Sequence, residues 1–191
     1  MRCMLCENLS LTHICKPCQT IYLTPSLYKR QLTNEITVFS FYKYNEIKKF
    51  LYTKHTDIGY YIYNILAENS LKKFALAFEF EEKVVSISID DTIKNGYSHT
   101  AILNHSLQSR IIKPLYKRLR AKNSISYSAK SRNFRMSNPR EFQLMPFKNK
   151  NVILVDDIIT TGATLTQAVE ILQKADKEVL FCLTLCDVSI K

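Results

Sequence analysis

Residues 152–164, VILVDDIITTGAT, combine the residue types that suit a phosphorylated sugar. An apolar run is followed by two carboxylates, Asp156 and Asp157, and then by threonines around Gly162, one of only three glycines in the chain. Paired carboxylates suit the vicinal hydroxyls of a ribose, with or without a bridging Mg²⁺. A turn that opens a helix offers free N–H groups to a phosphate, and glycine lets the backbone approach it. These residues predict a ribose 5-phosphate site, and an ordinary strand–turn–helix with an Asp cap is the alternative. The predicted phosphate-binding residues are Thr160, Thr161, Gly162, Ala163 and Thr164.

Four cysteines near the amino end form two closely spaced Cys-x2-Cys pairs, Cys3/Cys6 and Cys15/Cys18. Four thiolates at about 2.3 Å from one ion complete a closed tetrahedral zinc site. A closed shell has no open position, so the predicted zinc is structural rather than catalytic. A redox pair or a coincidence of spacing are the alternatives, and His13 is a candidate substitute ligand that we expect to be a bystander.

Basic residues are concentrated between Arg110 and Lys150, where 12 Lys/Arg stand against a single acid, Glu141. That segment alone carries +11, compared with +10 for the whole chain. Such a concentration indicates a polyanion site, although a merely solvated face is the alternative. Tyr127 and Phe134 lie within it and could stack on unpaired bases, which favours single-stranded DNA. The candidate DNA-binding residues are Arg120, Lys122, Lys130, Arg132, Arg135 and Arg140.

Composition places the chain among globular proteins. It has 191 residues, of which 46% are hydrophobic, so it can bury a core. No run of 18 or more apolar residues predicts a membrane span, and the amino end lacks the apolar core of a signal peptide. We therefore expect a cytosolic protein. Two parts are predicted, a four-cysteine zinc finger at 1–22 and an α/β domain at 23–191 that contains a basic mobile loop at about 122–141.

The remaining pattern predicts strands alternating with helices. Expected strands are 37–44, 84–89, 152–155 and 179–185. Expected helices are 58–71, with Tyr61, Ile65 and Leu66 on one face, 101–119, interrupted or kinked at Pro114, and about 165–175. This alternation indicates a parallel sheet covered by helices on both faces, with ligands at the carboxyl ends of its strands. Cys182 and Cys186 are expected to be buried as small hydrophobes in or just after the last strand. A zinc finger of this size needs to dock on the main domain or on a partner.

The 152–164 segment resembles the 5-phosphoribosyl-1-pyrophosphate (PRPP) motif of type I phosphoribosyltransferases. That resemblance implies a type I phosphoribosyltransferase-like fold, an acid pair that contacts the ribose hydroxyls, and a turn that wraps the 5′-phosphate. The combination with the cysteine pairs, Lys54, the loop at Gly96 and the pattern Arg135-x2-Asn138-x3-Phe142 resembles the ComF family of competence proteins. Membership would imply a role in natural transformation, handling incoming single-stranded DNA with a membrane-associated helicase as partner. The protein would then lie at the inner face of the membrane through partners, with no span of its own.

Two departures from that family bear on catalysis. The strand end Val-Pro-x-Pro stands here as residues 85–88, VSIS, and the turn Arg-Gly-Phe-Asn stands as residues 95–98, NGYS. The adjacent pair Asp90 and Asp91 would repel pyrophosphate unless a metal intervened. We therefore expect no transferase activity and assign no catalytic residue. An active phosphoribosyltransferase of nucleotide salvage is the alternative, and a PRPP- or nucleotide-sensing regulator is a third possibility.

Overall fold

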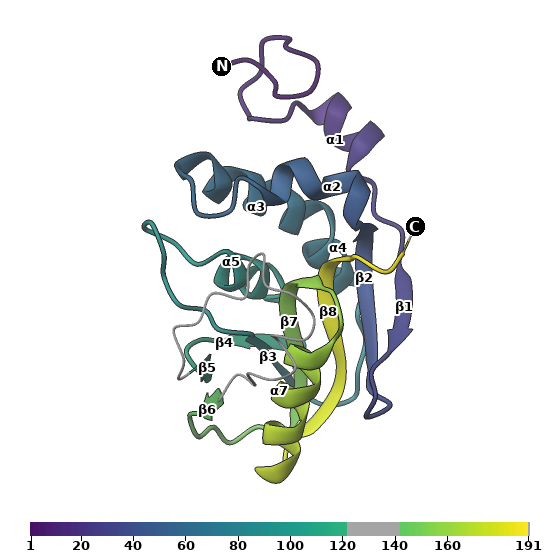
Figure 1. Cartoon of the computed structure of the whole chain (residues 1–191), viewed down its shortest axis with the longest axis vertical. Helices are drawn as coiled ribbons and strands as arrows, with labels where there is room; N and C mark the ends of the chain where they lie inside the picture. The colour runs from purple at the N-terminus through teal and green to yellow at the C-terminus, as the bar shows by residue number, and fades with distance from the viewer. Residues whose placement is uncertain (122–141, 191) are drawn as a thin grey trace.

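The computed structural model describes residues 1–121 and 142–190 (Figure 1). Its centre is a six-stranded sheet in which β1 pairs antiparallel with β2 and all other neighbours run parallel. In spatial order the strands are β1 (Tyr28–Gln31), β2 (Thr37–Lys43), β8 (Glu178–Asp187), β7 (Asn151–Ile159), β3 (Val84–Ser88) and β4 (Ile112–Leu115). A second, two-stranded antiparallel sheet pairs β5 (Leu119–Ala121) with β6 (Phe142–Leu144). The predicted α/β class with a mostly parallel sheet is confirmed.

Helices cover both faces of the large sheet, because its central strands are apolar on both sides. Along β7, Ile153 and Val155 belong to one core, whereas Val152 and Leu154 belong to the other. The second core is closed by α7 (Ala163–Lys174). The first core is closed by α2 (Tyr44–Leu51), α3 (Asp57–Asn69), α4 (Leu71–Ala77) and α5 (His99–Ser106).

Cys182 and Cys186 lie on β8 and are buried in the two cores, as predicted. Burial raises the pKa of both thiols far above its usual range, with a smaller contribution from the nearby acids. Both side chains therefore stay protonated and pack as small apolar groups.

The cysteine-rich amino end packs on the rest of the chain. Ile14 is fully buried in the first core, and the short helix α1 (Lys16–Tyr22) follows the cysteine loops. Asn69 at the end of α3 donates to Gln19 Oε1 at 3.0 Å, and the His13 ring stacks on Tyr61 with centroids 4.7 Å apart. The expected docking is therefore present.

The predicted helix over 101–119 is wrong beyond Ser106. Residues Ile112–Leu115 form β4 instead, paired with β3 so that Pro114 lies opposite Ser86. Proline removes a ladder donor, and this strand tolerates the loss because it lies at the edge of the sheet. The sequence predicted an interruption at Pro114, but it did not predict the strand that contains this proline.

The residues predicted to share one face of α3 differ in burial. Leu66 is buried as expected, but Tyr61 is 53% exposed and packs on His13, while Ile62 and Tyr63 face the core. The helix is rotated so that its phenol Tyr63, not Tyr61, reaches the strand ends. None of the helices in the described ranges has the length and apolarity needed to cross a membrane.

Candidate functional site

The phosphate-loop segment connects β7 to α7 at the carboxyl end of the sheet. β7 continues through both carboxylates to Ile159, which pairs with Asp187 of β8, so the strand is longer than predicted. Residues 160–162 then turn, and α7 begins at Ala163. A hollow at this junction is lined by Asp156, Gln167 and residues 158–165. The predicted order of strand, turn and helix is therefore confirmed, although β7 ends four residues later and α7 begins two residues earlier than expected.

Gly162 is required by the backbone of this turn. Its φ of 85° lies in the left-handed region, which side chains other than glycine rarely adopt. A Cβ there would also lie 2.8 Å from Leu32 Cδ2. The absent side chain therefore makes room for Leu32, a packing reason for glycine that the sequence did not indicate. The close approach of a phosphate at Gly162 stays a prediction.

The backbone N–H groups at the start of α7 lie beside the hollow. Ala163 N–H donates to Thr161 Oγ1 at 3.3 Å, and the first helical bond runs from Thr166 N to Gly162 O. Gly162 at the cap position supplies no side chain to the intervening N–H groups. Free N–H groups and the positive end of the helix dipole at such a position favour an anion.

The two carboxylates have different surroundings. Asp156 lines the hollow beside α7, and its Oδ1 accepts from the N–H of Asp157. Asp157 is 6% exposed and lies on the face of the sheet that α3 and α5 cover. Its Oδ2 accepts from Lys54 Nζ at 2.8 Å and from Tyr63 OH at 3.3 Å. His99 Nε2 lies 3.4 Å from the same oxygen. Asp157 is thus the counter-ion of a buried cluster, whereas Asp156 lines the hollow beside α7.

The protonation states of this cluster follow from burial and charge. Burial alone would raise the pKa of Asp157, but the Lys54 ammonium holds it well below its ordinary value. Burial lowers the pKa of His99 to about 4, and Asp157 only partly offsets this effect. At neutral pH the cluster is therefore a carboxylate and an ammonium with a neutral imidazole that can donate a hydrogen bond.

His99 predicts a specific dependence of stability on pH. Its pKa of about 4 in the folded protein is below the 6.5 of an exposed imidazole, so the unfolded chain binds more protons between these values. We expect the free energy of unfolding to fall by about 3 kcal/mol as the pH is lowered from 6.5 to 4. Urea unfolding at several pH values should show this slope, and it should be absent in His99→Gln. Equal slopes in both proteins would contradict the assignment.

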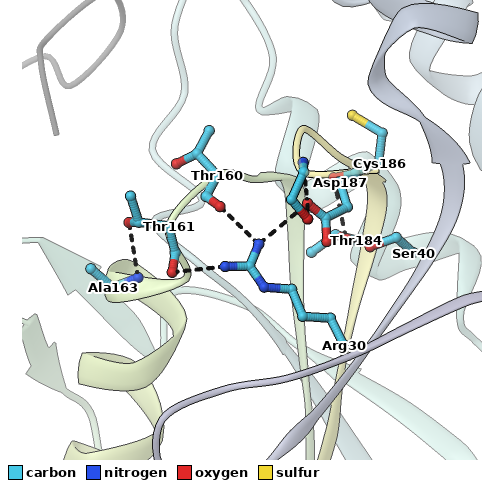
Figure 2. Close-up of polar contacts among 9 residues, drawn as sticks. Arg30, Ser40, Thr160, Thr161, Ala163, Thr184, Cys186 and Asp187 are labelled. Carbon is cyan, nitrogen blue, oxygen red and sulfur yellow. Dashed lines mark hydrogen bonds and ion pairs between the residues drawn. The ribbon is translucent and has the colours of Figure 1, made fainter. Parts of the chain in front are cut away.

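Arg30 on β1 holds the turn from the opposite side, as Figure 2 shows. Its Nη1 donates to the carbonyl of Thr160 at 2.8 Å, its Nη2 donates to the carbonyl of Thr161 at 3.2 Å, and Nη1 lies 3.3 Å from Asp187 Oδ1. Asp187 is fully buried at the end of β8 and also accepts from Ser189 N and Oγ. Because two successive carbonyls point at the guanidinium, the turn has a fixed orientation.

Sequence reasoning missed Arg30 altogether. It is separated from the turn by 130 residues and lies on a four-residue strand that was not predicted. Arg30 lies outside the basic segment at 110–150, and no motif around it indicates a contact with the turn.

We expect Arg30→Met to weaken the affinity for ribose 5-phosphate about tenfold, because the loss of two charge-assisted hydrogen bonds frees the turn. Arg30→Lys should retain part of the affinity. Lys29→Met, at the exposed neighbouring position on β1, is the matched control and should bind like the wild type. Calorimetric titration measures this, and unchanged affinity in Arg30→Met would show that the guanidinium does not position the turn.

The four cysteines of the amino end form a cluster that fits a metal ion. Their sulfur atoms all lie within 4.8 Å of one another, and Cys6 Sγ is 3.7 Å from Cys15 Sγ. Tetrahedral Zn–S bonds of about 2.3 Å put sulfurs about 3.8 Å apart, so this spacing fits. Desolvation alone would raise the pKa of Cys3, but N–H donation from Cys15 and Leu5 to its sulfur lowers it to about 6.

Most of the predicted DNA-binding residues lie outside the described residues. Arg120 is exposed on β5, whereas the others are in 122–141, as are Tyr127, Phe134 and Asn138. Phe142, from the same family pattern, is buried on β6 in the second core.

The acid pair after β3 differs from the expectation in one respect. Asp91 is buried, and its Oδ2 accepts from the backbone N–H of Lys117 at 2.6 Å. The negative charge of Asp91 is therefore partly compensated by this hydrogen bond inside the protein. The predicted repulsion of pyrophosphate depends mainly on Asp90, whose Oδ1 accepts from Thr92.

Comparisons with known proteins agree with the loop geometry. The phosphoribosyl transferase domain family matches residues 109–191, which contain β7, the turn and α7. A ribose-phosphate pyrophosphokinase from Pyrococcus furiosus is 49% identical over 47 residues, which are 22% of this chain and 17% of that protein. The carboxyl-terminal part of the chain is therefore phosphoribosyltransferase-like in sequence.

Solved structures of phosphoribosyltransferases show low similarity to this chain. A hypoxanthine phosphoribosyltransferase from Staphylococcus aureus is 18% identical, with 65% of this chain and 62% of that chain covered and a TM-score of 0.40. An adenine phosphoribosyltransferase is 16% identical, with 90% and 89% covered and a TM-score of 0.44. This chain thus spans less than two thirds of the first of these proteins, and no activity is inferred from either.

Proposed function

We propose that this chain is a ComF-type competence protein that binds a phosphoribosyl ligand and handles incoming single-stranded DNA in the cytosol. One observation supports the proposal: the turn of the PRPP-like segment with its adjoining hollow and a four-cysteine cluster belong to one packed structure. A nucleotide-salvage enzyme needs the first feature and has no evident use for the second. Structural zinc held by Cys3, Cys6, Cys15 and Cys18 is part of the proposal.

The proposed ligand contacts follow from the hollow beside α7. The N–H groups of the first turn and the hydroxyl of Thr164 bind the 5′-phosphate, since they meet at the helix N-terminus. Asp156 contacts the ribose hydroxyls, directly or through Mg²⁺ when PRPP is the ligand. Asp157 supports the site from behind by neutralising Lys54. PRPP and ribose 5-phosphate share this chemistry, and both are candidate ligands.

Transfer of the phosphoribosyl group is not part of the proposed function. Asp90 stands at the end of β3, where the family grips pyrophosphate, and would repel it in the absence of a metal. An active phosphoribosyltransferase of nucleotide salvage is the second candidate, since the motif at 152–164 suits both. Base-dependent release of pyrophosphate from PRPP would favour that second candidate.

The proposed DNA contact depends on the basic segment. Its described parts, residues 110–121 and 142–150, contain seven Lys/Arg and no acid, so they suit a phosphate backbone. A membrane-associated helicase of the uptake machinery is the proposed protein partner, which would place the protein at the inner face of the membrane. A deletion strain should lose transformation while growing normally on purine and pyrimidine precursors. A salvage defect with normal transformation would overturn the proposal.

In vitro, single strands should bind more tightly than duplex, because duplex bases offer no free face for stacking. Affinity should fall steeply with salt as counterions are released. Replacing Arg132, Arg135 and Arg140 together by Ala should flatten the salt dependence, while replacing Lys48 and Lys49 on α2 should have little effect. Gel-shift titrations measure both. Equal affinity for single and double strands would leave the charges as a solubility feature.

A further inference from the structure

A second, larger hollow lies on the other side of the sheet from α7, between α3, α5 and the segments that follow β3 and β4. It is a groove of about 380 Å³ and is lined mainly by apolar atoms. Its walls include the rings of Tyr60, Tyr97 and Tyr116, and its rim includes Ile93 and Lys117. Neither the phosphate turn nor the cysteine cluster contributes to this groove.

Hydrogen bonds and ring contacts orient the tyrosine rings that line the groove. Tyr60 and Tyr97 meet edge to face with centroids 5.9 Å apart, and Tyr97 OH accepts from the N–H of His55 at 3.1 Å. Tyr116 OH lies 2.9 Å from His105 Nδ1. The rings are therefore oriented before any ligand arrives, while Tyr60 and Tyr116 remain 46% and 41% exposed.

The chemistry of the groove favours a planar ring that carries phosphate on one side. Exposed tyrosine faces suit stacking with an aromatic ligand. The described basic residues of 110–121 follow from β4 into β5, and Lys117 itself lies on the rim. The nearest carboxylate, Asp91, is buried and accepts from the backbone of Lys117, so its charge is partly satisfied within the protein.

We propose that this groove receives an unpaired nucleobase of single-stranded DNA, stacked on Tyr60 and Tyr116, while the strand's phosphates follow the basic residues of β4 and β5. This inference rests on the proposed DNA function and adds a site to it. In this inference Tyr60 and Tyr116 have the base-stacking role that the sequence analysis expected of Tyr127 and Phe134. A protein segment or a free mononucleotide in the groove are outcomes that the test distinguishes.

The test compares a thymine oligonucleotide of about 20 residues with an abasic strand of the same length, using fluorescence anisotropy. Tyr60→Ala and Tyr116→Ala should each weaken binding of the thymine strand about tenfold, since one stacked base is lost. Both variants should bind the abasic strand as the wild type does. Tyr60→Trp should retain affinity for the thymine strand. Tyr52→Ala, which removes an exposed tyrosine outside the groove, is the control and should change nothing.

Four results would overturn the inference. Wild-type affinities that are equal for the two strands would exclude base stacking, and unchanged thymine-strand binding in both Ala variants would exclude this groove. In either case the proposed DNA function would stand. A micromolar affinity of wild type for thymidine 5′-monophosphate, lost in Tyr60→Ala, would make the groove a small-molecule site. Absence of any single-strand binding would refute the proposed DNA function and this inference together.

Discussion

Asp157→Asn should lower the free energy of unfolding by about 3 to 5 kcal/mol, because it leaves the Lys54 ammonium without its counter-ion. Asp156→Asn, one residue earlier, should leave stability nearly unchanged and abolish binding of ribose 5-phosphate. Adjacent carboxylates of one motif are thus expected to fail in different ways. Urea denaturation measures the first effect, and calorimetric titration measures the second.

A double variant separates the charge effect from a loss of packing. Lys54→Met combined with Asp157→Asn removes both partners of the ion pair, and its stability should recover by at least half of the loss. The Asp157 pair would be unimportant if the single and double variants were equally unstable. If Asp156→Asn were the destabilised protein, the assignment of the two carboxylates would be reversed.

Removal of the metal should have a comparably large effect. Cys3 and Cys18 are buried in the first core, so loss of the ion would expose apolar surface as well as free thiols. We expect Cys15→Ser to lose about one zinc per chain and to unfold the amino-terminal segment, since structural zinc contributes its binding free energy to folding. Metal analysis and hydrogen exchange at residues 1–22 measure these two effects.

Cys182→Ala is the matched control for the metal. It removes a buried thiol from β8 and should cost some stability through a small cavity, yet it should keep its full zinc content. Protein purified without chelator that contained no zinc would remove the metal assignment, whatever its stability.

The strongest sequence patterns predicted the parts of the fold that local chemistry determines. An apolar run ending in acids and a glycine-containing turn indicated β7 and the start of α7, and the cysteine spacing indicated the cluster. In contrast, β4 was missed because Pro114 is compatible with a strand only at a sheet edge, a property that the sequence does not reveal.

The details of the site depend on long-range contacts. Nothing near Asp157 in the sequence distinguishes it from Asp156. Their surroundings differ because Lys54 and His99 lie on the face of the sheet to which Asp157 points. Arg30 reaches the turn across a sheet order that places β1 and β2 beside β8. The turn at Gly162 was predicted, but its neighbour Leu32 comes from a distant part of the chain.

The most direct test of the account is calorimetric titration of wild-type protein with ribose 5-phosphate, and with PRPP in the presence of Mg²⁺. We predict saturable binding with one site per chain, lost in Asp156→Asn and in Gly162→Val, whose backbone cannot adopt the φ of 85° without strain. At about millimolar ligand, calorimetry would detect even a weak site with a binding free energy of about −4 kcal/mol. Absence of binding by wild type at that concentration would contradict the phosphoribosyl site at the centre of the proposal.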